Sequence, residues 1–387
     1  MEETNLLYDP LDSATIDDPF DAFRALRDEA PVYHMEREDL WYLSRFDDVK
    51  AALYDWRTYS SAQGNQVRED PERIGKTMTT NDPPRHDQIR RLVQMGFTPK
   101  RVEAHAERIN SLTDDLIAQL PDDGFDFVSD FAGPLTGLVI GSLIGVPDED
   151  LEMIRKMIDE GLSFTDEHPN GKGLKPVFDY VLEMVADRRA NPGEDMMSAF
   201  CGAEDAGFTM SDLDIAVTCG SILGAGFSST GHQLGNIAFA LHQLPDVRRE
   251  VLADPALIPN LVEESMRWDV STMAFARQTT CEVELHGTTI PADARVVCLL
   301  SSANRDERQY DRADEFVLQR GKAHNLGFGH GIHYCMGVSL ARMEMRVALE
   351  KILPVMGEFD IDLDNAVRLK HLNFRGHREL PIKIASK

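Results

Sequence analysis

Residues 325–337 read NLGFGHGIHYCMG and lead into an apolar helical pattern that runs from Val338 to Leu353. The first three glycines of the stretch allow positive φ and a close approach of the backbone to a flat object. Cys335 stands near the start of the helical pattern, where unpaired N–H groups and the helix dipole favour a thiolate and so suit a metal ligand. Taken alone, such a cysteine is more often a small buried apolar side chain.

Four residues of this stretch form the pattern Phe-x-x-Gly-x-x-x-Cys-x-Gly, namely Phe328, Gly331, Cys335 and Gly337. The pattern resembles the haem-binding loop of the cytochrome P-450 family. The resemblance implies a mainly α fold with small β-sheets, a helix-rich triangular prism that holds haem b between a long distal helix and the cysteine loop. It also implies that Phe328, Cys335 and Gly337 bind the haem, with the Cys335 thiolate as the iron ligand that promotes O–O cleavage.

The composition indicates one acidic globular unit. The chain has 387 residues, a formal net charge of -26 and 42% hydrophobic residues. This charge disfavours nucleic acid and anionic membranes as partners, because both select basic patches. Domains of this length usually split, but no linker or repeat divides the chain, so we expect a single domain over 1–387.

The cysteines and the N-terminal segment bear on localisation. The five cysteines show no close paired spacing, which indicates a reducing compartment without disulfides. Residues 1–19 are acidic and polar, without the basic and apolar regions of a secretory signal or a membrane anchor. We therefore expect a cytoplasmic protein that is not bound to a membrane, and we expect it to be a monomer.

The first hundred residues contain a second group of candidate site residues. Residues 20–29 and 46–54 have helical spacing, 32–35 and 40–43 are typical of a short hairpin, and 60–78 is a long polar loop. A helix starting after Pro84 then carries His86 and Arg90 on one face. Alone, this pair is typical of a solvated surface. The resemblance assigns both residues to the haem propionates, together with Arg277 and His333, and arginine suits carboxylates well.

Further helices are expected over 102–120, 135–144, 149–162 and 177–190. The breaker-rich loop 168–173 connects the last two. In the family, this pair and its loop form a mobile lid over the substrate.

The longest predicted helix begins at Ser211, with Asp214 completing a near capping box, and ends before Pro245. Residues 215–244 contain no charged side chain, which raises the possibility of a membrane span of about 20 apolar residues. A polar cluster in the middle and the lack of basic and aromatic anchors favour a buried helix instead.

This helix resembles the family's distal helix, in which Ala-Gly-x-acid-Thr crosses the haem. The corresponding residues begin at Ala225, with Gly226 retained, Ser228 at the position of the acid and Ser229 at that of the threonine, followed by Thr230. The resemblance therefore gives Gly226, Ser228, Ser229 and Thr230 the catalytic positions. A serine has no proton that titrates near neutral pH, so we expect proton delivery to be impaired at this site.

Glu264 and Arg267 form a Glu-x-x-Arg motif on another predicted helix. By itself this spacing is typical of a surface ion pair. In its order along the chain it resembles the family's pair that pins the core near the cysteine loop, with Arg320 as the third member. Short strands are expected over 283–285, 288–290 and 296–300, and the tail 372–376 is expected to return toward the substrate.

The resemblance implies a soluble bacterial-type monooxygenase that inserts one atom of O2 into an apolar or aromatic small molecule, by hydroxylation or O-dealkylation. Electrons would come from NAD(P)H through a ferredoxin or flavodoxin. If they share one face, six basic residues would form a docking patch for an acidic ferredoxin, with ordinary solvated helix faces as the alternative: Arg90, Arg91, Lys100, Arg101, Arg342 and Arg346. Two alternatives stay open, a peroxide-driven peroxygenase and a haem-thiolate sensor without turnover. The substrate pocket is expected to be lined by apolar residues, each of which could equally belong to the core, namely Leu223, Phe227, Met273, Phe275 and Phe374.

Overall fold

The computed structural model describes residues 7–162, 172–320 and 324–384. The helices are α1 (Ser13–Asp17), α2 (Phe20–Glu29), α3 (Phe46–Tyr54), α4 (Arg85–Gln94), α5 (Pro99–Ala104), α6 (Ala106–Ile117), α7 (Gly133–Ile144), α8 (Leu151–Leu162), α9 (Lys175–Ala190), α10 (Met196–Gly202), α11 (Asp212–Gln243), α12 (Pro245–Ala253), α13 (Ile258–Trp268), α14 (Leu300–Ala303) and α15 (Val338–Met356). The strands are β1 (Val32–Met35), β2 (Leu40–Leu43), β3 (Tyr59–Ser60), β4 (Gly124–Asp126), β5 (Ala274–Thr279), β6 (Val283–Leu285), β7 (Thr288–Ile290), β8 (Arg295–Leu299), β9 (Phe359–Ile361), β10 (Val367–Arg368), β11 (His377–Glu379) and β12 (Pro381–Ile384).

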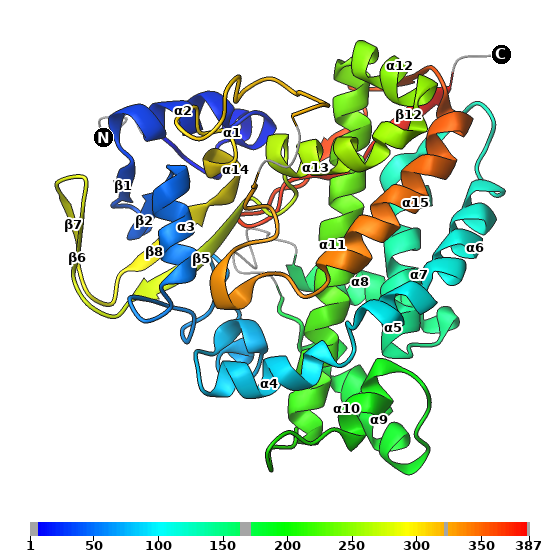
Figure 1. Cartoon of the computed structure of the whole chain (residues 1–387), viewed down its shortest axis with the longest axis horizontal. Coiled ribbons are helices and arrows are strands. Elements are labelled where there is room, and N and C mark those ends of the chain that lie inside the picture. The colour runs from blue at the N-terminus through cyan, green and yellow to red at the C-terminus, as the bar shows by residue number, and fades with distance from the viewer. Residues whose placement is uncertain (1–6, 163–171, 321–323, 385–387) are drawn as a thin grey trace.

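The fold is mainly α with small β-sheets, as the sequence predicts. Figure 1 shows α11 running through the molecule, with the strands β1, β2, β8 and β5 on one side and α5 to α8 on the other. The largest sheet has the strand order β1-β2-β8-β5-β3. Its β1–β2 hairpin is antiparallel, and β2 pairs in parallel with β8. The predicted hairpin is therefore the outer part of a sheet that only tertiary pairing completes.

The long helix α11 begins as the capping pattern predicts. The Ser211 hydroxyl accepts a hydrogen bond from Asp214 N at 3.1 Å, and the Asp214 carboxylate accepts one from Ser211 N at 3.0 Å. Its buried flank is closely packed, because a Cβ atom on Gly226 would come within 2.6 Å of Ile140 Cγ1. A glycine at this position thus lets α7 approach the middle of α11.

The C-terminal tail returns to the start of β5, as expected. Thr272 and Phe374 form a β-bridge, and Met273 N donates to Asn373 O at 2.7 Å. Ser271 O accepts from Arg375 N at 2.8 Å. These bonds fix a turn of the tail beside the segment that enters the central sheet.

One predicted helix is divided in the structure, and one predicted connection lies largely outside the described residues. The helix predicted over 102–120 is two helices, α5 and α6, because His105 N bonds to Val102 O at 3.1 Å and so breaks the regular ladder. The helices α8 and α9 lie where the lid pair is predicted, but most of the loop 168–173 falls outside the described residues.

Among the described residues, one apolar stretch, Phe127–Ile144, has the length and composition of a membrane span. It is not the long helix that raised this question in the sequence. Within the protein, 61% of the stretch is buried, as in a core helix, so it is weak evidence for a span.

The structure brings Glu264, Arg267 and Arg320 together in a buried ionic cluster. Arg267 binds Glu264 through Nη2–Oε1 at 2.7 Å and Nε–Oε2 at 2.9 Å, and Arg320 Nε lies 3.0 Å from Glu264 Oε1. The side chains of Arg267 and Glu264 are 1% and 4% exposed. Arg267 also donates to the carbonyls of Asn304 and Ala313 at 3.0 and 2.7 Å. The cluster therefore ties α13 to the segment that precedes the cysteine loop.

We expect Arg267→Met to lower the free energy of unfolding by about 3–5 kcal/mol, because it leaves the Glu264 charge buried without its main partner. The matched control is Arg346→Met, which breaks the exposed ion pair to Glu350 and should change stability by less than about 1 kcal/mol. Denaturant unfolding followed by circular dichroism measures both. Similar small losses in the two variants would contradict a structural role for the buried cluster.

Candidate active site

The cysteine loop precedes α15, and two of its first three glycines have the positive φ that the sequence allows, whereas Gly327 does not. Gly329 and Gly331 have φ of 72° and 71°, a conformation that favours glycine. A Cβ atom on Gly331 would also lie 2.5 Å from Leu53 O, so the loop packs directly against the end of α3. Cys335 N donates to Phe328 O at 3.0 Å, which folds the loop back on itself. The loop thereby holds Cys335 just ahead of Gly337, the N-cap of α15.

The surroundings of the Cys335 sulfur have opposing effects on its charge. Burial raises the pKa of the Cys335 thiol, whereas the Gly337 N–H and the guanidinium groups of Arg90 and Arg342 lower it. Together, these effects raise the pKa of the Cys335 thiol when no cation is bound. Because a bound cation favours the thiolate, this half-buried cysteine is suited to metal ligation.

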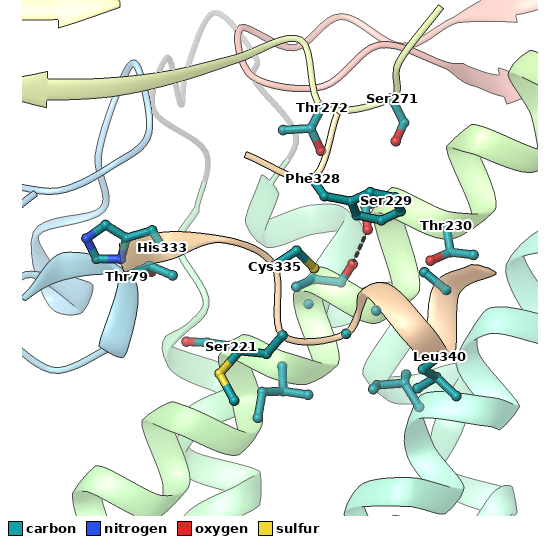
Figure 2. A pocket seen from close by; sticks show the side chains of 18 of the residues that line it. Thr79, Ser221, Ser229, Thr230, Ser271, Thr272, Phe328, His333, Cys335 and Leu340 are labelled. Carbon is teal, nitrogen blue, oxygen red and sulfur yellow. Dashed lines mark hydrogen bonds between the residues drawn. The ribbon is translucent and has the colours of Figure 1, made fainter. Parts of the chain in front are cut away.

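A cavity of about 320 Å³ lies between the cysteine loop and α11. Figure 2 shows Cys335 and Phe328 on one side, Ser229 and Thr230 of α11 nearby, and His333 toward the other end. The Ser229 hydroxyl donates to Ala225 O at 2.8 Å, so its oxygen can still accept a hydrogen bond. The cavity thus exposes a candidate metal ligand and helix hydroxyls to one shared space.

Of the four residues expected at the propionates, His333 lines this cavity, His86 and Arg277 are buried, and Arg90 and His333 are half-buried. Three of the four have buried nitrogens without a partner among the described residues. Within the described chain, His86 Nε2, Arg90 Nη1 and both ring nitrogens of His333 are buried without a hydrogen-bond partner. The two imidazoles are neighbours, with ring centroids 4.7 Å apart. Arg277 is 3% exposed and donates to Ala276 O at 2.8 Å.

Buried donors of this kind are costly unless a ligand satisfies them. Burial comes first among the causes that lower the pKa values of His333, Arg90 and Arg277, as expected for groups awaiting an anionic partner. Two carboxylates at the edge of a flat macrocycle would supply such partners. The residues present therefore fit haem, whose iron Cys335 would ligate and whose propionates these side chains would bind.

We expect Arg90→Ala to weaken haem retention by about one to two decades, since one charge-assisted hydrogen bond contributes roughly 1.5–3 kcal/mol. Haem transfer to an excess of apomyoglobin measures the loss, and the carbonyl band should keep its position because Cys335 is untouched. Arg346→Ala is the surface control. Unchanged retention in single variants of all four expected residues would refute the propionate assignment.

Two of the five residues expected in the substrate pocket, Phe275 and Phe374, line the cavity. Leu223, Phe227 and Met273 do not, and all three are buried in core clusters. Phe227 points at α7, where a Cβ atom on Gly137 would be 2.2 Å from its ring. The structure thus does not bring these three to the cavity. An apolar side chain on α11 or ahead of β5 has the same character in sequence whether it faces the core or the cavity.

Three of the four residues at the expected catalytic positions of α11 line the cavity, and one does not. Gly226, Ser229 and Thr230 line the cavity, whereas Ser228, at the position of the family's acid, is half-buried and does not. Among the described cavity-lining residues, the one carboxyl group belongs to Glu344 on α15. Burial raises the pKa of Glu344 to about 8, and its Oε1 has no partner in the described chain.

Sequence reasoning missed Glu344 and also Arg73, a buried arginine of the cavity wall. A signal existed for Glu344, which follows Leu340 by four residues and so falls on the buried stripe of α15. Arg73 lies in the loop 60–78, where no periodicity marks buried positions.

The expected basic patch is weaker than its sequence suggests. Arg342 pairs with Glu263, Arg346 with Glu350 and Arg91 with Asp205. These carboxylates neutralise much of the local positive charge, because paired opposite charges cancel at a distance.

Comparison with known proteins identifies the family to which this fold belongs. The family model described as Cytochrome P450 matches residues 171–372. A relative from Mycobacterium tuberculosis, named putative cytochrome P450 123, is 35% identical over 398 residues, which cover 100% of this chain and 98% of the relative. The erythromycin C-12 hydroxylase of Saccharopolyspora erythraea is 34% identical and covers 93% of both chains. A solved mutant of P450 EryK in complex with erythromycin B superposes with a TM-score of 0.88 at 32% identity, covering 96% of this chain and 98% of that one.

A helix-rich fold with a cysteine loop facing a long helix defines a haem-thiolate type of protein. The chain belongs to the cytochrome P450 family, and more specifically its relatives are bacterial P450 monooxygenases. The predicted family and fold class are confirmed. A haem-iron cofactor follows from the family.

Proposed function

We propose that this protein is a haem b monooxygenase that inserts one atom of O2 into an apolar or aromatic small molecule, by hydroxylation or O-dealkylation. The observation that carries the proposal is the shared cavity, in which Cys335, the hydroxyls of Ser229 and Thr230 and the rings of Phe275 and Phe374 meet. The bound haem would supply the iron at which oxygen is activated.

The chain's own residues have separate tasks in this proposal. Cys335 ligates the iron, and His86, Arg90, Arg277 and His333 bind the propionates. Ser229 holds a water by its free acceptor positions, since its proton is engaged with Ala225 O. The apolar wall excludes bulk water and orients the substrate by shape.

We further propose that electrons come from NAD(P)H through a ferredoxin or flavodoxin, and that the protein is a cytoplasmic monomer formed by one domain over 1–387. Docking of the donor beside the cysteine loop would use shape and apolar contact more than net charge, because Arg342 and Arg346 are paired. Tyr334, 38% exposed in the loop itself, provides such an apolar contact.

Turnover with labelled oxygen tests the proposed function. The haem-loaded protein, NADH, a ferredoxin and its reductase are incubated under ¹⁸O₂ with terpenes, fatty acids, steroids and methoxy-aromatics. Hydroxylated products are expected to carry one ¹⁸O atom; in O-dealkylation the label appears in the released aldehyde. Label taken from water, or a panel with neither a spin shift nor product, would contradict the monooxygenase assignment, and the second result would favour a haem-thiolate sensor.

A peroxide-driven reaction is the second candidate, and the serine at position 228 favours it. No carboxyl group stands at this position of α11, and the Ser228 side chain does not reach the cavity wall. Peroxide brings its own two protons and two electrons, so this route depends less on a relay from the protein.

A further inference from the structure

Arg73 is a buried cation on the cavity wall, and the proposed function gives it no role. Among the described residues that line the cavity, it is the one arginine or lysine. It lies at the end of the short 3₁₀ turn Pro71–Arg73, and its side chain is 8% exposed. A guanidinium group this deeply buried needs partners for all its N–H groups.

The protein satisfies Arg73 incompletely. Its Nη1 donates to Glu69 Oε1 at 2.7 Å, whereas Nη2 has two long contacts of 3.4 Å, to Asn65 Oδ1 and Thr79 Oγ1. The Nε atom is buried without a hydrogen-bond partner in the described part of the chain. The Nε–H group is therefore free, and the Nη2 amino group is only weakly engaged, on the wall of an otherwise largely apolar cavity.

The group is also held rigidly, as a preformed binding site requires. Thr80 Oγ1 donates to Arg73 O at 2.7 Å, which fixes the backbone. Glu69 fixes the side chain and is itself locked, because its Oε2 accepts from Asn65 N at 2.7 Å and from Gln66 N at 3.0 Å. A ligand that meets this donor pays little additional ordering entropy.

The charge balance around Arg73 determines which hydrogen-bond acceptor a ligand can place there. The Arg73–Glu69 ion pair is neutral as a unit, and both side chains are less than a tenth exposed. A carboxylate there would have to share the one guanidinium of the described cavity wall with Glu69, which already holds it at 2.7 Å, and burying a second carboxylate charge in this way is unfavourable. A ketone, lactone or amide carbonyl needs a donor alone, and a charged donor makes a stronger hydrogen bond to it than a neutral one.

We infer that Arg73 anchors the substrate through a neutral carbonyl group, and that the substrate class is an apolar ring system carrying a ketone, lactone or amide. The inference rests on the proposed function, because it assigns the recognition chemistry of the same cavity. The apolar body lies against Phe275 and Phe374, and the carbonyl oxygen accepts a hydrogen bond from the Arg73 guanidinium.

A matched set of ligands tests this inference on the haem-loaded protein. The probes are 2-adamantanone, adamantane and adamantane-1-carboxylate, which share one rigid skeleton and differ in the acceptor. Affinities are measured by calorimetry and by the haem absorption shift. We expect the ketone to bind about 10-fold or more tightly than the hydrocarbon, as one hydrogen bond to a charged donor allows, and the carboxylate to bind more weakly than the ketone.

The diagnostic variant is E69Q/R73M, which removes both charges and so avoids leaving Glu69 buried and unpaired. It should lose the preference for the ketone and keep the affinity for adamantane. Arg57→Met, at an exposed arginine, should keep the preference. If the double variant fails to fold, Arg73→Lys, which retains the ion pair but lacks the free Nε donor, should still reduce the preference.

Three results would overturn the inference: equal or absent binding of the ketone in the wild type, tighter binding of the carboxylate, or an unchanged ketone preference in the variants. Loss of haem in E69Q/R73M with an unchanged preference would place Arg73 at the haem instead. Failure of the proposed function is a separate result, because it is read from the labelled-oxygen experiment and from the carbonyl spectrum.

Discussion

Replacing Cys335 by alanine should abolish the long-wavelength Soret band that thiolate ligation gives to the reduced carbonyl complex. The physical reason is that this sulfur is the one thiol on the described cavity wall, held there by the Cys335 N–Phe328 O hydrogen bond of 3.0 Å. No other thiolate can then donate charge to the iron. NADH-driven product should fall below detection in the same variant, while haem can still be retained through its propionates.

Cys281→Ala is the control for this experiment, because Cys281 is exposed. It should leave both the band and the turnover unchanged. A histidine-type carbonyl spectrum in the wild type would show that the central assignment is wrong. Survival of the thiolate band in Cys335→Ala would show the same.

The second large effect is expected from the missing proton donor at Ser228. A positioned general acid typically contributes about 10²–10⁴-fold to a rate, and Ser228 offers none. We therefore expect an unusually high ratio of peroxide-driven to ferredoxin-driven product in the wild type. Ser228→Glu should lower this ratio, because it restores a carboxyl group to α11. Ser228→Gln should not lower it, because glutamine has the size of glutamate but no titrating proton.

Product yield per NADH and per peroxide, measured on one substrate, provides the ratio. Tight coupling of NADH consumption to product in the wild type, with no peroxide-driven product, would refute the predicted high ratio. Glu344→Gln tests whether Glu344, the one carboxyl group on the described cavity wall, replaces the missing acid. With its pKa near 8, Glu344 is protonated at pH 7 and loses its proton as the pH rises through 8. If Glu344 supplies the protons, ferredoxin-driven turnover should decline over that pH window and be lost in the variant.

In the buried ionic cluster, the sequence motif predicts one contact, and the tertiary structure determines the others. The spacing of Glu264 and Arg267 predicts that the two can meet on a helix, and their separation of 2.7 Å agrees with this. Their burial depends on the segments around Asn304 and Ala313, whose carbonyls Arg267 binds. Arg320 joins them from a distant part of the chain, and its place was implied by resemblance and not by local spacing.

The substrate side of the cavity was less predictable than the cysteine side. The loop motif is continuous in sequence, so its glycines, its cysteine and its helix start could be interpreted together. The pocket is assembled from five or more separated segments. Phe227 and Phe275 have the same apolar character, yet Phe227 fills the contact with α7 and Phe275 faces the cavity.

By itself, the sequence determined the family, the mainly helical fold, the capped long helix and the cysteine that marks the haem side, because each depends on residues close together along the chain. The tertiary structure alone decided which side chains share the cavity. It turned Ser228 and Phe227 away from the cavity wall, and it brought Arg73 and Glu344 to it from segments far apart in sequence. The physical reason is that burial and free hydrogen-bonding capacity depend on how elements pack against one another, which no local pattern of residues encodes.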